Sequence, residues 1–75
     1  MAFLPVLSGR DVVRALAHDG WLTARQRGSH IILVKTGSIV TLSVPDHREV
    51  AKGTLRSLIR SSGLTIEEFV QLTRK

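Results

Sequence analysis

Glycine, serine and proline divide the middle of this chain into three short segments, and these turn residues restrict the possible fold more than any other sequence feature. The second segment is rich in β-branched residues and too short for a helix, and the other two alternate apolar with polar residues. The segments span 21–27, 30–35 and 39–44, with turns at 28–29 and 36–38 and a stop at Pro45. We predict a three-stranded meander.

The alternation within the outer segments predicts which side chains share a face of the sheet. In the first segment, Thr23, Arg25 and Arg27 are expected together on one half-exposed face. The third segment separates two sets of alternate residues, which are Val40, Leu42 and Val44 on one side and Ile39, Thr41 and Ser43 on the other.

A helical pattern precedes the strands. Ser8 is placed to cap a helix that begins there, Asp11 to reach back to it, and Leu7 to pack on Val12. Gly20 marks the stop. The expected apolar stripe comprises Val12, Val13, Leu16 and Ala17, and the expected polar side carries Arg10, Arg14 and His18.

Two further helices are predicted after a polar loop from Pro45 to Ala51, which holds Asp46, His47, Arg48 and Glu49. The second helix opens at 53–55 and stops at Gly63, and residues 65–68 form a capping box for a short third helix. The second helix should direct Leu55, Leu58 and Ile59 inward and Arg56 and Arg60 outward. The third helix should bury Ile66, Phe69 and Val70.

The α-β-β-β-α-α order predicts an α+β fold with helices packed on one face of an antiparallel sheet. The other face is then free for a ligand. Because 75 residues bury only about 60% of the surface of the unfolded chain, we expect a single domain over residues 1–75.

Charge favours polyanionic partners. The net charge is +5, and arginine, whose planar fork suits phosphate, supplies most of the cations. A basic surface that serves only solubility is the alternative. The absence of cysteine excludes disulfides and thiolate metal sites and fits a reducing compartment, and the apolar start is too short for a membrane span, so we expect a cytoplasmic protein without membrane contact.

His30 is the leading candidate for chemistry, because an imidazole can both take and give a proton near neutral pH. Arg25 and Arg27 stand close enough in sequence to hold a phosphate near it, while Gly28 and Ser29 would shape the turn. RNA brings its own nucleophile, the 2′-hydroxyl, so cleavage needs a base, an acid and cations but no metal in principle. The alternative is a turn histidine without a catalytic role.

The other candidates carry weaker signals. His47 is a possible second acid or base in a charged loop, and His18 is most simply solvated. Three scattered histidines predict no metal site and no cofactor. Arg56 extends the possible phosphate contacts, although a solvated helix face is an equal alternative, and Trp21 is expected in the core rather than as a stacking platform.

The chain resembles the HicA toxin family over nearly its whole length. The motifs that carry the resemblance are, in order, Ser8-Gly9-Arg10-Asp11-Val12-Val13 with Leu16, Gly20-Trp21, Arg25-Gln26-Arg27-Gly28-Ser29-His30, Val44-Pro45 with His47, Gly53-Thr54-Leu55-Arg56-Ser57-Leu58-Ile59 and Gly63-Leu64-Thr65. Each is short, but their order and spacing within 75 residues are specific.

The resemblance implies a double-stranded-RNA-binding-domain-like fold and a ribosome-independent mRNA interferase activity that arrests growth. It places the catalytic histidine at His30 and implies a HicB-type antitoxin that masks the site, with a free monomer and a hetero-oligomer in the complex. Many relatives carry a second histidine directly after the catalytic one, where this chain has Ile31. The rival functions are a non-catalytic RNA-binding module and a protein that binds an acidic protein partner.

Overall fold

The three strands form one antiparallel sheet in the order β1-β2-β3, as the turn pattern predicts. The computed structural model describes residues 3–75. Its elements are α1 (Gly9–Ala17), β1 (Leu22–Arg27), β2 (His30–Val34), β3 (Leu42–Pro45), α2 (Lys52–Ser62) and α3 (Ile66–Thr73).

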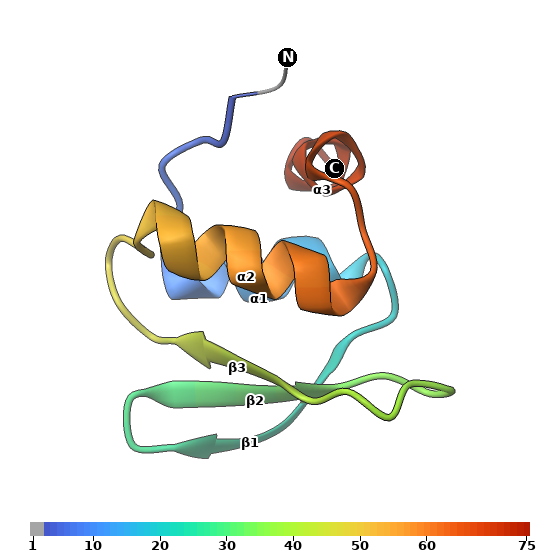
Figure 1. Ribbon diagram of the computed structural model, residues 1–75. Helices are drawn as coiled ribbons and strands as arrows, with labels where there is room; N and C mark the ends of the chain where they lie inside the picture. The colour runs from blue at the N-terminus through green and yellow to red at the C-terminus, as the bar shows by residue number, and fades with distance from the viewer. Residues whose placement is uncertain (1–2) are drawn as a thin grey trace.

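Helices cover one face of this sheet (Figure 1). Both α1 and α2 contact β3, and α3 packs against α1 and α2 on the side away from the strands. In the part of the chain that the structure describes, no element covers the opposite face of the sheet, which we call the open face (Figure 1). The predicted α+β class and helix placement are therefore confirmed.

The hydrophobic core lies between the helices and the sheet. Each element contributes except β1, whose residues are all exposed. Trp21, which precedes β1, is buried in the core as predicted, and the Lys35 ammonium lies 5.9 Å from its ring centroid. The buried set comprises Leu7, Val12, Ala15, Leu16, Trp21, Ile31, Leu33, Leu42, Val44, Val50, Leu55, Leu58, Ile59 and Phe69.

The predicted helix caps are present. At α1, the Asp11 N–H donates to Ser8 Oγ at 3.0 Å and the Ser8 N–H donates to Asp11 Oδ2 at 3.1 Å. Thr65 and Glu68 make the same reciprocal pair at α3, over 3.0 and 2.8 Å. These side chains satisfy N–H groups that the first helical turn leaves without partners.

The third strand begins at Leu42, three residues later than predicted. The Val40 N–H donates to Ser38 Oγ at 3.1 Å, and that hydroxyl donates to the Val40 carbonyl at 3.3 Å. Such local hydrogen bonds compete with a strand ladder. They keep Ile39 to Thr41 in the loop that follows β2.

A β-bulge corrects the predicted face of Thr23. The strand register shifts between Thr23 and Arg25, so that Thr23 is opposite Leu33 whereas Arg25 is opposite Ile32. A bulge inserts one unpaired residue and reverses the alternation beyond it. Thr23 therefore lies on the helix side of the sheet, and only the two arginines share the open face.

Smaller differences concern the helices. Ala15 rather than Ala17 completes the buried stripe of α1, and Val13 is only half-buried. The second helix begins at Lys52, one residue earlier than the predicted opening, and its N-cap residue makes no side-chain cap. Within residues 3–75, none of the helices has both the length and the apolar character that a bilayer crossing requires.

Candidate functional site

His30 lies in a hollow of about 400 Å³ on the open face, together with Arg27, Ile32 and Ser43. Alternation along β2 produces this placement, because Ile31 and Leu33 are buried against the helices and His30 and Ile32 consequently point the other way. Arg27 is directly opposite His30 in the ladder, and Ser43 of β3 is opposite Ile32. Residues opposite one another in antiparallel strands share a face, so the register itself brings these groups together.

The turn before His30 has two residues. Gly28 has φ +57°, a conformation that costs other residues more, and a positive φ with glycine at this first central position is typical of a type II′ hairpin turn. The Ser29 carbonyl accepts a hydrogen bond from the Asp46 N–H at 2.6 Å. The turn is thus tied to the residue that follows β3.

Sequence reasoning gave no role to Asp46, just as it gave none to Ser43 and Gln26. Asp46 Oδ2 accepts from Gln26 Nε2 at 3.2 Å and from the Arg10 guanidinium at 3.3 Å. Gln26 Nε2 also lies 3.2 Å from the Gly28 carbonyl, to which it donates. This cluster connects α1, β1 and the loop after β3 to the Gly28-Ser29 turn that precedes His30. Only the proximity of Asp46 to Pro45 in sequence hinted at it.

Arg25 and Arg27 are both on the open face, as the ladder partners Ile32 and His30 show. Arg56 is elsewhere. It lies on α2 within the helical layer, where it lines a separate hollow with Arg60, Leu64 and neighbouring residues. The structure therefore brings together Arg25, Arg27, Gly28, Ser29 and His30, and it does not bring Arg56 to them.

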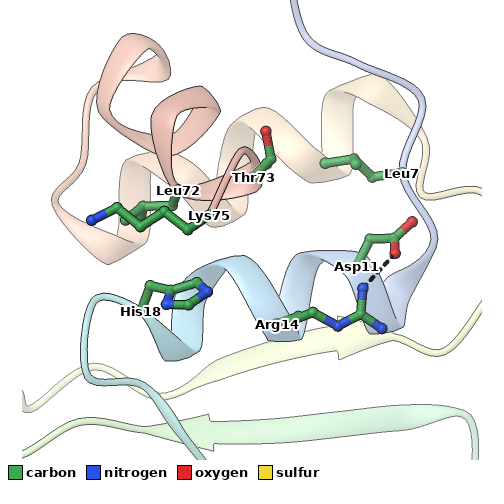
Figure 2. A pocket seen from close by; sticks show the side chains of 7 residues that line it. All are labelled: Leu7, Asp11, Arg14, His18, Leu72, Thr73 and Lys75. Carbon is green, nitrogen blue, oxygen red and sulfur yellow. Dashed lines mark hydrogen bonds and ion pairs between the residues drawn. The ribbon is translucent and has the colours of Figure 1, made fainter.

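The other two histidines lie apart from the hollow that holds His30. His47 is exposed in the loop after β3, where its carbonyl accepts from the Gly9 N–H at 2.9 Å. Figure 2 shows His18, the C-cap residue of α1, facing the C-terminal end of α3 across a hollow of about 260 Å³. Residues 3–75 contain no cluster of three histidine, aspartate or glutamate side chains arranged to hold a metal ion.

Ile31 lies on the opposite side of the sheet from His30. It is 6% exposed and packs in the core. A histidine at position 31 would consequently point toward the helices and not into the hollow with His30. The isoleucine at this position, where many relatives carry a second histidine, therefore removes no proton-transfer group from the open face.

The hollow that holds His30 combines its imidazole with the guanidinium of Arg27 and the hydroxyl of Ser43, and Arg25 adds a second guanidinium on the same face. An imidazole can transfer protons, and arginine forks bind phosphate oxygens. The groups are exposed to solvent and are available to a large substrate. The arrangement suits proton transfer on a phosphodiester.

Comparison with known proteins identifies the family and supports the fold. The family model described as the HicA toxin of bacterial toxin-antitoxin matches residues 9–64. No curated protein gave a match. A solved structure, described as a toxin-antitoxin complex from Streptococcus pneumoniae, contains a chain that is 30% identical, with a TM-score of 0.69 over 77% of this chain and 98% of that one. This chain belongs to the HicA toxin family.

Proposed function

We propose that the protein is an endoribonuclease toxin that cleaves mRNA without a metal ion, with His30 as its general acid or base. The observation that supports this most directly is the ladder pairing of His30 with Arg27 at the rim of an open hollow. One group transfers protons, and the other stabilises the negative charge that develops on a phosphate.

In the proposed reaction the 2′-hydroxyl of one nucleotide attacks the adjacent phosphorus atom. The new P–O2′ bond forms as the P–O5′ bond breaks, which leaves a 2′,3′-cyclic phosphate and a 5′-hydroxyl. His30 either removes the 2′-hydroxyl proton or protonates the departing O5′. A second group or water performs the complementary transfer, and His47, in the charged loop after β3, is the histidine considered for that role.

Four neighbouring residues serve substrate binding in this proposal. Arg27 and Arg25 contact the RNA backbone on the open face, and the Gly28-Ser29 turn permits close approach of the scissile phosphate. A Cβ built on Gly28 meets nothing within 4 Å, so the space beside the turn is open. Arg56 contacts only RNA that extends over the helical layer.

A HicB-type antitoxin is the proposed protein partner, and the open face is the proposed place where it binds and excludes RNA. The name of the Streptococcus pneumoniae relative supports such an assembly. So do Leu22 and Val34, which pair on the open face with 63% and 40% exposure. Aliphatic side chains of this kind suit a protein contact better than a nucleic acid.

The decisive experiment compares His30→Ala with the wild type on a defined oligoribonucleotide in the presence of a chelator. A general acid or base contributes about 10²–10⁴-fold, so cleavage by the variant should fall by that factor. His18→Ala is the matched control, because that histidine, the C-cap residue of α1, is exposed and lines another hollow. This variant should cleave at the wild-type rate.

Three results would oppose the proposal. A folded His30→Ala protein that cuts at the wild-type rate removes His30 from the mechanism. Cleavage of a substrate with a single 2′-deoxynucleotide at the cut position excludes attack by the 2′-hydroxyl. RNA binding that weakens with salt but gives no product would favour the rival, a non-catalytic RNA-binding module.

A further inference from the structure

A further hollow, of about 330 Å³, lies between α1 and β1 on the helix side of the sheet. Its lining comprises Arg10, Val13, Arg14, Thr23, Gln26 and Ile31. Gln26 and Ile31 are the chain neighbours of Arg27 and His30, and they point to the other side of the same two strands. The two hollows therefore lie back to back across the β1-β2 pair, which the Gly28-Ser29 turn closes at one end.

The lining of this α1–β1 hollow has three kinds of group. Val13 and Ile31 form an apolar floor, because one is half-buried and the other belongs to the core. Thr23 offers a hydroxyl, and Gln26, whose Nε2 donates to Asp46 Oδ2 and to the Gly28 carbonyl, offers its Oε1 as an acceptor. The side chains of Arg10 and Arg14 are each 71% exposed at the rim.

The polar groups at the turn end of the hollow are held in place. Asp46 Oδ2 accepts from both Arg10 and Gln26, at 3.3 and 3.2 Å, and thereby fixes the two side chains relative to each other. Exposed ion pairs of this kind are weak, and a guanidinium has five donors. Most donors of Arg10 consequently remain available to a ligand.

We propose that the α1–β1 hollow binds a nucleotide of the substrate RNA that flanks the scissile phosphate. This inference rests on the proposed function. The arginines would bind the phosphate, the Gln26 amide would hydrogen bond to the edge of the base, and the base would lie on Val13 and Ile31. The RNA strand would pass from one hollow to the other over the Gly28-Ser29 turn, beside which Gly28 leaves open space.

Three features favour a nucleotide over an acidic protein segment in this hollow. Guanidinium forks match phosphate oxygens, an apolar floor matches a base, and the amide oxygen of Gln26 matches an amino group on a base edge. The hollow should therefore add affinity and base preference, while proton transfer stays with His30 on the open face. Asp46 acts as a positioning residue that holds Arg10 and Gln26.

The test measures RNA binding by the full chain with His30→Ala, so that the oligoribonucleotide stays intact. Adding Arg10→Ala should lower the magnitude of the slope of log affinity against log salt by about 0.7, the value for one phosphate contact in a single strand. Arg74→Ala removes the same charge from the exposed end of α3 and should leave the slope unchanged. Gln26→Leu should reduce discrimination between oligonucleotides that differ at one base.

Cleavage by the protein with His30 intact gives a second readout. Arg10→Ala should raise the KM for an oligoribonucleotide several-fold with little change in kcat. The KM for a dinucleotide that is too short to reach the hollow should be unaffected. Arg10→Lys keeps the charge but loses the fork, so its KM should lie between those of the wild type and Arg10→Ala. Thermal unfolding establishes that each variant is folded.

Two outcomes would overturn the inference and leave the proposed function intact. One is that the Arg10→Ala protein binds and cuts RNA normally, in the same way as the Arg74→Ala protein. The other is an Arg10→Ala protein that loses affinity only for the antitoxin, which would make the hollow a protein-binding site. A wild-type protein that neither binds nor cuts RNA would instead refute the proposed function itself.

Discussion

Replacement of Gly9 by alanine should destabilise the protein, although alanine is the better helix former. Gly9 is the first residue of α1, and its backbone lies directly against the chain that leaves β3. A Cβ at this position would overlap the Pro45 carbonyl oxygen and would lie 3.0 Å from Asp46 Cα. All of these atoms belong to the backbone, so no side-chain rotation can relieve the overlap.

The size of the effect follows from two opposing terms. Overpacking of a tight site costs about 1–3 kcal/mol, and a glycine-to-alanine change in a helix gains about 0.5–1 kcal/mol. The overlap is with backbone atoms, which places the first term at about 2–3 kcal/mol, so the net loss is about 1–2.5 kcal/mol. Because 1 kcal/mol shifts Tm by about 4–8 °C in a domain of this size, Tm should fall by roughly 4–20 °C.

Gly53→Ala is the matched control. Gly53 lies in the first turn of α2, and a Cβ built there meets nothing within 4 Å. The same substitution should raise Tm by about 2–4 °C, since it gains about 0.5 kcal/mol without a clash. Circular dichroism on heating measures both variants. A Gly9→Ala protein as stable as Gly53→Ala would refute the steric reasoning.

Three further predictions concern the core, a helix cap and the strand face. Phe69→Ala should cost about 3–5 kcal/mol in urea unfolding, because Phe69 is 0% exposed and fixes α3 to the core; a cost near zero would make α3 dispensable. The Ser8 N–H that donates to Asp11 lowers the pKa of Asp11 below 3.8, so its contribution to stability is present above that pH and is lost as the pH falls through the lowered pKa. The stability difference between wild type and Asp11→Asn should therefore shrink in acid, and an unchanged difference at low pH would contradict this. Ile31→His should destabilise the fold by about 1–3 kcal/mol without raising kcat, and a gain in kcat would show that a side chain at position 31 reaches the scissile phosphate on the open face.

Local signals in the sequence were sufficient for most of the fold. The caps at Ser8 and Thr65, the stop at Gly63 and the two-residue turn at Gly28-Ser29 each depend on residues within four positions. The bulge beside Ala24 was not predictable, because it depends on how β1 meets β2. The late start of β3 was missed for a different reason, since the Ser38 hydroxyl competes for the Val40 backbone.

The candidate site was only partly predictable. His30 and Arg27 are three residues apart, so a tight turn between them was enough to place them opposite each other. Ser43 joins the hollow of His30 from 13 residues further along the chain, and the contact between Gln26 and Asp46 spans 20 residues, so no local pattern encodes either. The charge of Arg56 suggested a substrate contact, but its helix packs away from the open face.

The length of the β1-β2 turn couples folding to the proposed chemistry. Strand side chains alternate with a period of two, so a slip of one residue between Arg27 and His30 would turn the imidazole toward the helices and expose Ile31. Such a slip would bury a polar ring and remove an apolar side chain from the core, both of which are unfavourable. Selection of the correct register by the core therefore also places His30 beside Arg27 on the open face. The same alternation places Gln26 in the α1–β1 hollow, so a single register would set both the proposed proton-transfer site and the proposed nucleotide site.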